Sequence, residues 1–219
     1  HSTNLYLNYA IPDHSAMPTA EEIAALVTAF QERGRTPHLE FLPTIAPDVE
    51  AALMVAGFTV EKRMPLMVCP SGARLDLSMP EGIELIIPTS DSEIMALLTV
   101  QNEAYGDPPP DAASLQRRKA FHAAGGSAIL ARDKATGEPV GGGISDLPIV
   151  GVTELAGVGV RPPFRRRGIA TAVTTRLVRD AIAAGISKVF LMAEGDAEAR
   201  IYRRVGFVDC GEVLGISQR

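Results

Sequence analysis

The chain has 219 residues and a formal net charge of -5, which argues against a general nucleic-acid binder and against a protein that lies on a membrane surface. Hydrophobic residues make up 46% of the chain but tryptophan is absent, so Leu, Val, Ile, Ala and Met must fill the core. No apolar run approaches the roughly 20 residues of a membrane helix, and the two distant cysteines, Cys69 and Cys210, favour a reduced, cytoplasmic protein over one with a disulfide.

The N-terminal part is predicted to alternate strands and helices. Strands are expected at residues 4–10 and 38–42, and helices at 19–33 and 47–55. Thr19 and Glu22 have capping-box spacing, so their side chains can bond the first N–H groups of the helix that follows Thr19. The chain begins with His1 rather than Met, which suggests that it is cut or starts with a tag remnant.

A stretch with Pro, Gly and Ser at residues 69–82 is the predicted linker. We therefore expect a half-domain at residues 1–72, a linker at 73–81 and a larger domain at 82–219. The larger domain begins with a predicted strand at 83–87, helices at 91–105 and 112–124, and strands at 127–132 and 140–145.

The most informative segment joins a predicted strand at residues 154–160 to a predicted helix at 171–184. The turn between them reads Arg165-Arg-Arg-Gly-Ile-Ala170. It lacks the acidic residue that usually occupies the start of a helix. Unpaired N–H groups and three arginines therefore leave a positively polarised helix end open to an anion, and a pyrophosphate fits that description.

Residues 160–170 resemble the acyl-CoA pyrophosphate loop of the GNAT superfamily of N-acetyltransferases, which reads Arg/Gln-x-x-Gly-x-Gly/Ala after a strand ending in Val-x-Pro. Residues 199–207 resemble the last helix of that family, which closes on a Tyr-x-x-x-Gly-Phe pattern. One predicted strand, Lys188–Met192, separates the two segments, as in the family. The resemblance covers roughly Gly82 to the C-terminus and implies a mixed α/β fold, built on an α+β mixed sheet, with acetyl-CoA as co-substrate.

The N-terminal part also looks like a faded copy of the C-terminal part. Gly57-Phe58 aligns with Gly206-Phe207 at an offset of 149 residues (206 minus 57), and the neighbouring predicted helices and strands align at the same offset. Internal duplication, giving a degenerate N-terminal half-repeat, is the hypothesis, and a coincidental helix-Gly-Phe-strand unit is the alternative. This copy is expected to have no cofactor site. Its first helix begins with the acids Glu21 and Glu22, and Leu53 aligns with the tyrosine of the Tyr-x-x-x-Gly-Phe pattern.

The resemblance assigns cofactor binding to the loop and to the strand before it. The loop amides and three arginines would hold the pyrophosphate, and the strand's backbone would pair with the pantetheine arm and face the thioester oxygen. A solvated basic surface is the alternative for the arginines, and loose packing of small residues is the alternative for the strand. The residues assigned are Val158, Gly159, Val160, Arg165, Arg166, Arg167, Gly168, Ile169, Ala170 and Thr171.

Two side chains are candidates for proton transfer. Glu154 lies where family members with a glutamate base carry it, and a carboxylate paired with a nearby arginine is the alternative. Tyr202 lies four residues before Gly206, where the family's general acid falls, and a core tyrosine is the alternative. Gly195-Asp196 replaces the Asn that many members use to contact the cofactor. Residues 105–108 are expected to form a wall of the acceptor pocket, and a plain turn is the alternative. No histidine set has metal-site spacing.

The resemblance therefore implies transfer of an acetyl group from acetyl-CoA to a primary amine, by direct attack in a ternary complex and without a metal. The acceptor is expected to be a small-molecule or peptide amine, and the protein a monomer or homodimer that binds neither nucleic acid nor membrane. A non-catalytic acyl-CoA-binding sensor or scaffold is the alternative. A third hypothesis is an assembly module in which both halves serve dimerisation.

Overall fold

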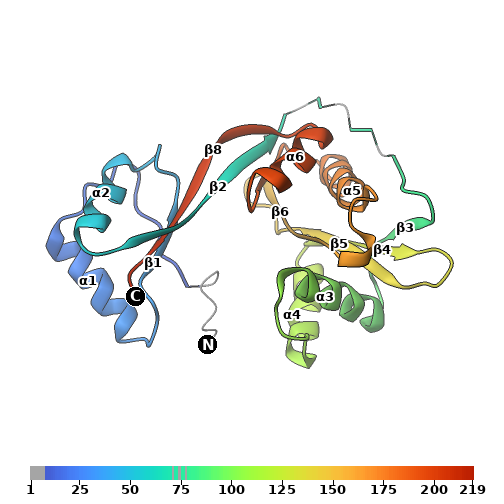
Figure 1. Cartoon of the computed structure of the whole chain (residues 1–219), viewed down its shortest axis with the longest axis horizontal. Helices are drawn as coiled ribbons and strands as arrows, with labels where there is room; N and C mark the ends of the chain where they lie inside the picture. Colours follow the sequence, from blue (N-terminus) through green and yellow to red (C-terminus); the bar gives the residue numbers. More distant parts are fainter. Residues whose placement is uncertain (1–7, 71, 74, 77) are drawn as a thin grey trace. The chain divides into compact units, whose positions relative to one another are not determined.

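The computed structural model describes residues 8–70, 72–73, 75–76 and 78–219, which divide into two compact units (Figure 1). Unit 1 consists of the described residues up to Leu66 together with residues 192–195 and 210–219, and unit 2 consists of residues 67–191 and 196–209. The division falls within β2 (Thr59–Cys69) and β8 (Val208–Ser217), so both strands contribute residues to both units.

Unit 1 contains α1 (Ala20–Gln31), β1 (His38–Phe41) and α2 (Pro47–Val55), with its strands in the order β1-β8-β2. β1 runs antiparallel to β8, and the register places Leu39 opposite Ile216 and Phe41 opposite Leu214. Side chains alternate between the two faces of a strand. These four residues therefore share one face, and the fold of unit 1 depends on the C-terminal strand.

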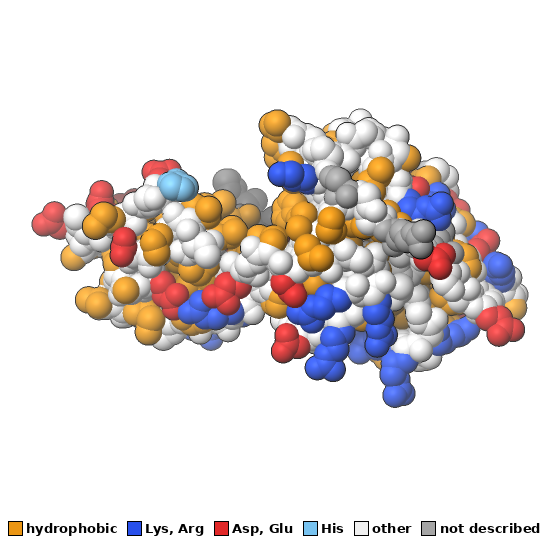
Figure 2. All heavy atoms as spheres, turned by 90° about the horizontal axis from the view of Figure 1, so that it is seen from above, with side chains coloured by type: hydrophobic (Ala, Val, Ile, Leu, Met, Phe, Trp, Pro, Cys, Tyr) orange, Lys and Arg blue, Asp and Glu red, His pale blue; other side chains and the backbone are white. Residues whose placement is uncertain are grey.

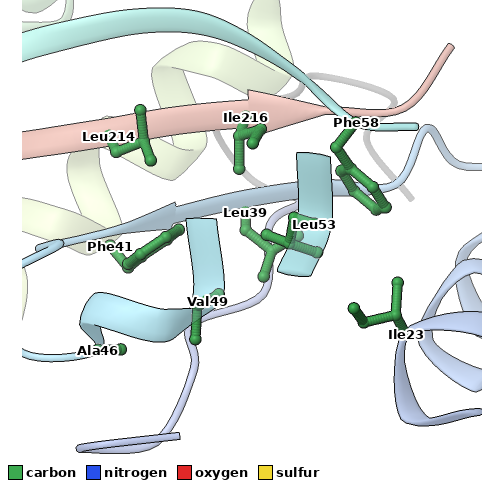
Figure 3. Close-up of a cluster of buried hydrophobic side chains, with 9 residues drawn as sticks. All are labelled: Ile23, Leu39, Phe41, Ala46, Val49, Leu53, Phe58, Leu214 and Ile216. Atoms are coloured by element: carbon green, nitrogen blue, oxygen red, sulfur yellow. The ribbon is translucent and has the colours of Figure 1, made fainter. Parts of the chain in front are cut away.

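The hydrophobic core of unit 1 lies between that face and the two helices (Figure 3). α1 contributes Ile23, and α2 contributes Val49 and Leu53, each of them buried. The complete cluster consists of Ile23, Leu39, Phe41, Ala46, Val49, Leu53, Phe58, Leu214 and Ile216. The core thus joins residues from the two ends of the sequence.

Unit 2 is a mixed sheet with helices on both faces, and its mixed α/β fold confirms the prediction from the sequence. Its strands lie in the order β7-β6-β5-β4-β3, and β6 and β7 are parallel while the other pairs are antiparallel. The elements in chain order are β3 (Ile83–Ile86), α3 (Asp91–Tyr105), α4 (Ala112–Ala123), β4 (Ser127–Asp133), β5 (Pro139–Ser145), β6 (Val152–Val160), α5 (Ile169–Ala183), β7 (Lys188–Met192) and α6 (Asp196–Val205).

Three consecutive buried glycines in β5 let helices approach both faces of this sheet. A Cβ at Gly142 would lie 2.2 Å from a methyl carbon of Leu97 in α3, and one at Gly143 would lie 3.1 Å from Val173 in α5. Neighbouring strand residues point to opposite faces, so α3 and α5 pack on opposite sides of β5. Figure 1 shows α3 and α4 on one side of the sheet and α5 and α6 on the other.

The observed elements match the predicted ones closely. α2, α3 and β7 have the predicted bounds, whereas α5 begins at Ile169 instead of Thr171 because Gly168 adopts a left-handed φ of 80° and acts as its N-cap. The strand expected at residues 4–10 falls mostly outside the described residues, although Ala10 forms a bridge with Leu39. Cys69 and Cys210 are free thiols.

Among the residues with a described placement, no helix has the length and apolarity needed to cross a bilayer.

Candidate functional site

The turn between β6 and α5 has an unusual backbone. Arg166 has a φ of 63° and Gly168 a φ of 80°, so two of its residues are in the left-handed region. The N-cap of α5 is Gly168, which has no side chain to accept hydrogen bonds from the first amides of the helix. The first turn of α5 also contains no acidic residue. The positive end of the α5 dipole is therefore not neutralised by this helix's own residues.

The amide groups of this turn are available to a ligand. Within the described part of the chain, the N–H groups from Arg166 to Thr171 make no hydrogen bond, and the first bonded amide is that of Ala172, which donates to Gly168 O at 3.0 Å. At the start of α1, by contrast, Glu22 N donates to Thr19 Oγ1 at 3.2 Å and Thr19 N donates to Glu22 Oε2 at 2.8 Å. The predicted capping box is confirmed there, and α5 has nothing equivalent.

The three arginines of the turn take different directions. Arg165 Nε donates to the carbonyl of Val160 at 3.1 Å. Arg167 donates to the carbonyl of Glu81 at 3.3 Å, and its guanidinium lies 5.5 Å from the centre of the Phe164 ring. All three side chains are exposed, and Figure 2 shows Lys and Arg side chains gathered on the displayed face of unit 2. Arg165 and Arg167 are thus partly held by backbone carbonyls, while all three guanidinium groups are accessible to solvent.

β6 pairs with β5 along most of its length but with β7 only over its first three residues. Its ladder with β7 runs from Val152↔Lys188 to Glu154↔Phe190, while its ladder with β5 continues to Val160. Beyond Glu154, the β7 side of β6 therefore presents a backbone edge that another extended chain can pair with. The segment Val158–Val160, predicted to bind the cofactor, lies on this part of the strand.

A bulge interrupts β6 at the same place. The register with β5 shifts between Gly142 and Ile144, and Gly157 has a φ of 59°. Two side chains of α3 contact the bulge: Gln101 Nε2 donates to Gly157 O at 2.8 Å, and the Tyr105 hydroxyl donates to Val158 O at 3.2 Å. Sequence reasoning did not single out Gln101, although an amide on the apolar face of a helix is a usable signal.

Both predicted proton-transfer residues lie in unit 2. Glu154 is half-buried in β6 between the buried side chains of Thr153 and Leu155. Tyr202 is half-buried in the last turns of α6, and its ring packs edge-on against Phe207 with centroids 6.1 Å apart. The Tyr202 carbonyl accepts hydrogen bonds from the amides of Gly206 and Phe207, both at 3.1 Å. The Tyr-x-x-x-Gly-Phe pattern therefore forms the C-terminal end of α6.

A cavity of about 720 Å³ lies at the opposite ends of β6 and α5 from the arginine turn. Its lining includes Thr153, Asp180 and His122 but none of the residues predicted to bind cofactor or move protons. His122 Nδ1 bonds Gly126 O at 3.2 Å, and burial lowers the pKa of this imidazole. The described residues contain no group of three His, Cys, Asp or Glu side chains that could hold a metal ion.

Just over half of the chain matches a known protein family. The sequence model described as the acetyltransferase (GNAT) family matches residues 93–207. No curated protein sequence matches the chain.

Three similar solved structures show the fold. A GCN5-related N-acetyltransferase from Kribbella flavida is 24% identical, with a TM-score of 0.79 over 99% of this chain and 83% of that one. A GCN5-related N-acetyltransferase from Sphaerobacter thermophilus is 18% identical, with a TM-score of 0.72 over 91% and 68%. A tandem GNAT protein from the clavulanic acid biosynthesis pathway is 12% identical, with a TM-score of 0.64 over 90% and 68%.

Proposed function

This chain belongs to the GNAT family of acetyltransferases, and on that premise we propose that it transfers an acetyl group from acetyl-CoA to a primary amine, by direct attack in a ternary complex. The observation that carries the proposal is the start of α5. Its amides from Arg166 to Thr171 are unbonded in the described chain, its N-cap has no side-chain partner, and its first turn carries no acid. A helix end of this kind binds a phosphate through N–H groups and the helix dipole together.

The pyrophosphate of acetyl-CoA fits this donor set. Gly168, Ile169, Ala170 and Thr171 would bind it through their amides, while Arg165, Arg166 and Arg167 would add charge-assisted hydrogen bonds. Arg165 and Arg167 already bond backbone carbonyls of unit 2, which leaves part of each guanidinium for a phosphate.

The backbone of β6 would hold the rest of the co-substrate. Beyond Glu154 its β7 side is an edge, so Val158, Gly159 and Val160 can pair with the amides of an extended pantetheine arm. The Val158 N–H lies at the bulge and is the donor that we assign to the thioester oxygen. Negative charge develops on that oxygen as the amine attacks, and a preorganised N–H stabilises it.

Glu154 and Tyr202 would move the protons. The amine nitrogen bonds the acetyl carbon, the carbon–sulfur bond breaks, and the sulfur leaves as a thiolate. Glu154, directly or through one water, takes the proton that the attacking nitrogen loses, and the Tyr202 hydroxyl gives a proton to the thiolate. A phenol hydroxyl within reach of the sulfur can serve as this acid.

The acceptor we propose is a small-molecule or peptide amine. The proposed catalytic groups are side chains and backbone amides of this chain, with no metal ion. We also propose a cytoplasmic location, a monomer or homodimer, and no nucleic-acid or membrane partner.

We further propose that unit 1 contains a degenerate half-repeat. At the offset of 149 residues, the start of α1 at Ala20 falls on the start of α5 at Ile169, and α2 and β2 fall on α6 and β8. The tandem arrangement named for one similar structure supports this. The α1 terminus is closed by its own Glu22, so only α5 would bind the cofactor.

Isothermal titration with acetyl-CoA, followed by thiol release over a panel of amines, tests the function. We expect acetyl-CoA to bind, Arg166→Ala to weaken its binding, and at least one amine to release thiol. Arg179→Ala, at an exposed arginine near the other end of α5, is the matched control and should leave binding unchanged. Binding without thiol release from any amine would contradict the transferase and favour the sensor.

A further inference from the structure

Gln101 contacts the β6 bulge from a buried position in α3. The side chain is 7% exposed, its Nε2 donates to Gly157 O at 2.8 Å, and its Oε1 accepts from Arg118 Nη2 of α4 at 3.2 Å. A guanidinium can only donate and a carbonyl can only accept, so these partners determine which end of the Gln101 amide is nitrogen. The side chain is therefore held in one orientation between Arg118 and the bulge.

This contact sets the direction of the peptide between Gly157 and Val158. The described chain contains no cis peptide, and in a trans peptide the N–H points opposite to the preceding C=O. Because Gly157 O is turned toward Gln101 in α3, the Val158 N–H points away from α3. A Cβ at Gly157 would lie 2.4 Å from Gln101 Nε2, so only glycine permits both the φ of 59° and the contact.

Arg118 brings a positive charge to this contact from outside the proposed cofactor site. Its guanidinium lies 5.1 Å from the centre of the Phe121 ring and bonds the Gln101 amide. Burial lowers the pKa of Arg118 while the charge of Asp146 opposes that shift, and an arginine keeps its proton at neutral pH. Hydrogen bonds in series polarise one another, so the cation strengthens Gln101 as a donor and, through the peptide, the Val158 N–H.

We propose that Gln101 and Arg118 are positioning residues for acetyl transfer, which aim and polarise the Val158 N–H toward the thioester oxygen. The inference rests on the proposed function and adds two residues from α3 and α4 to it. Neither residue contacts the reacting atoms, and both act through the bulge.

Substitutions at Gln101 separate a positioning role from simple packing. Gln101→Met keeps the length of the side chain and removes the donor, and we expect kcat to fall about 10- to 100-fold while the Kd for CoA stays within about threefold. Gln101→Glu has the same shape and still accepts from Arg118, but it turns a carboxylate toward Gly157 O. We expect an equal or larger loss of kcat in Gln101→Glu, again with the Kd for CoA within about threefold of the wild type.

Arg118 has a matched control in the same helix. Arg118→Met should lower kcat roughly tenfold, and Arg118→Lys should restore part of the loss because it returns the charge. Arg117 is exposed and pairs loosely with Asp111 at 4.0 Å, so Arg117→Met should behave as the wild type. Unchanged kcat in both Gln101 variants would overturn the inference.

An NMR measurement tests the same inference without an acceptor. We expect the Val158 amide proton of the wild type and of Arg117→Met to shift downfield with acetyl-CoA but not with CoA, and both Gln101 variants to lose this difference. A wild-type Val158 signal that responds equally to acetyl-CoA and CoA would overturn the inference. Absence of thiol release, together with an acetyl-dependent Val158 signal that needs Gln101, would instead contradict the proposed function and uphold the positioning.

Discussion

At the scale of single residues, the Tyr202 hydroxyl is the atom on which the proposed chemistry depends most. Its ring packs edge-on against Phe207, and this packing uses the ring alone, so a phenylalanine can keep it. We therefore predict that Tyr202→Phe lowers turnover about 10²- to 10⁴-fold while acetyl-CoA still binds, because the thiolate loses its proton donor. Steady-state thiol release and calorimetry measure the two effects.

Tyr9→Phe is the control for that variant, because Tyr9 lies in unit 1 and is 42% exposed. It should turn over acetyl-CoA at the wild-type rate. If Tyr202→Phe keeps full turnover, Tyr202 is a core tyrosine, which was the alternative interpretation.

The sequence predicted the local backbone of the candidate site where a short pattern covers a turn or a helix end, and it gave no indication of contacts that arise from packing; the roles of the site residues stay predictions. The arginine turn and the end of α6 are local, so their residues follow from short patterns. Gln101 lies 56 residues before Gly157, and only the packing of α3 on β6 joins them. Arg118 depends on a further contact between α3 and α4, which no periodicity in the sequence specifies.

At the scale of elements, the two aligned helices α1 and α5 offer an exchange experiment. Thr171 is the third residue of α5, where α1 has Glu22. We predict that Thr171→Glu weakens acetyl-CoA binding roughly tenfold or more, since a carboxylate would compete with phosphate for the free amides. Thermal stability should be unchanged or slightly higher, because an acid at a helix N-terminus is favourable.

Thr171→Gln is the matched control, with the same size and no charge. A Gln variant that binds as weakly as the Glu variant would show that bulk, rather than charge, blocks the turn. Equal affinity of the wild type and Thr171→Glu would remove the α5 terminus from cofactor binding altogether.

The start of α3 predicts a pH dependence of stability. Ser90 and Glu93 form a capping box, and hydrogen bonds from the Ser90 and Thr89 amides lower the pKa of Glu93 from 4.5 to about 2. A lowered folded-state pKa stabilises the fold above pH 4.5, and that contribution is lost as the pH falls toward 2. We predict that Glu93→Gln has a lower urea midpoint than the wild type near neutral pH, and that the difference between the two midpoints disappears as the pH falls from 4.5 toward 2.

Ser90→Ala should lower the free energy of unfolding by about 1 kcal/mol through the lost cap. It should also narrow the pH window over which stability is lost, because the Ser90 side chain is one of the groups that lower the pKa of Glu93. Urea midpoints of the three proteins measured across the acidic range provide the comparison. Parallel curves for the wild type and Glu93→Gln would contradict a lowered Glu93 pKa.

At the scale of the whole molecule, the compact units of the structure are not continuous segments of the sequence. The predicted parts 1–72, 73–81 and 82–219 are continuous segments and stay a prediction, whereas compact unit 1 also takes in residues 192–195 and 210–219. A pattern of helices and strands shows where elements begin and end, but not which strand pairs with which. The pairing of β1 with β8 joins residues about as far apart as the chain allows, and the sequence offers no local signal for it.

That pairing predicts what happens when the N-terminal segment is removed. Leu214 and Ile216 are fully buried in the core of unit 1, against residues of β1 and α2. A chain of residues 73–219 would expose both, at a cost of about 1.5–3 kcal/mol for each side chain. It would also leave β8 without both of its neighbours, β1 and β2, and β7 without β2. We expect this chain to aggregate or to bind a hydrophobic dye, and co-expression of residues 1–72 to restore a soluble complex.

The double substitution Leu214→Ser and Ile216→Ser in residues 73–219 separates the effect of exposed apolar surface from loss of the active unit. If exposed β8 causes the aggregation, the substituted chain should stay monodisperse and keep acetyl-CoA binding, because the α5 terminus and the β6 edge lie in the part of unit 2 that this chain retains. Size-exclusion chromatography and calorimetry measure both. A 73–219 chain that is monodisperse without the substitutions would show that β8 does not depend on β1 and β2. A substituted chain that is soluble but does not bind acetyl-CoA would show that the cofactor site needs residues 1–72.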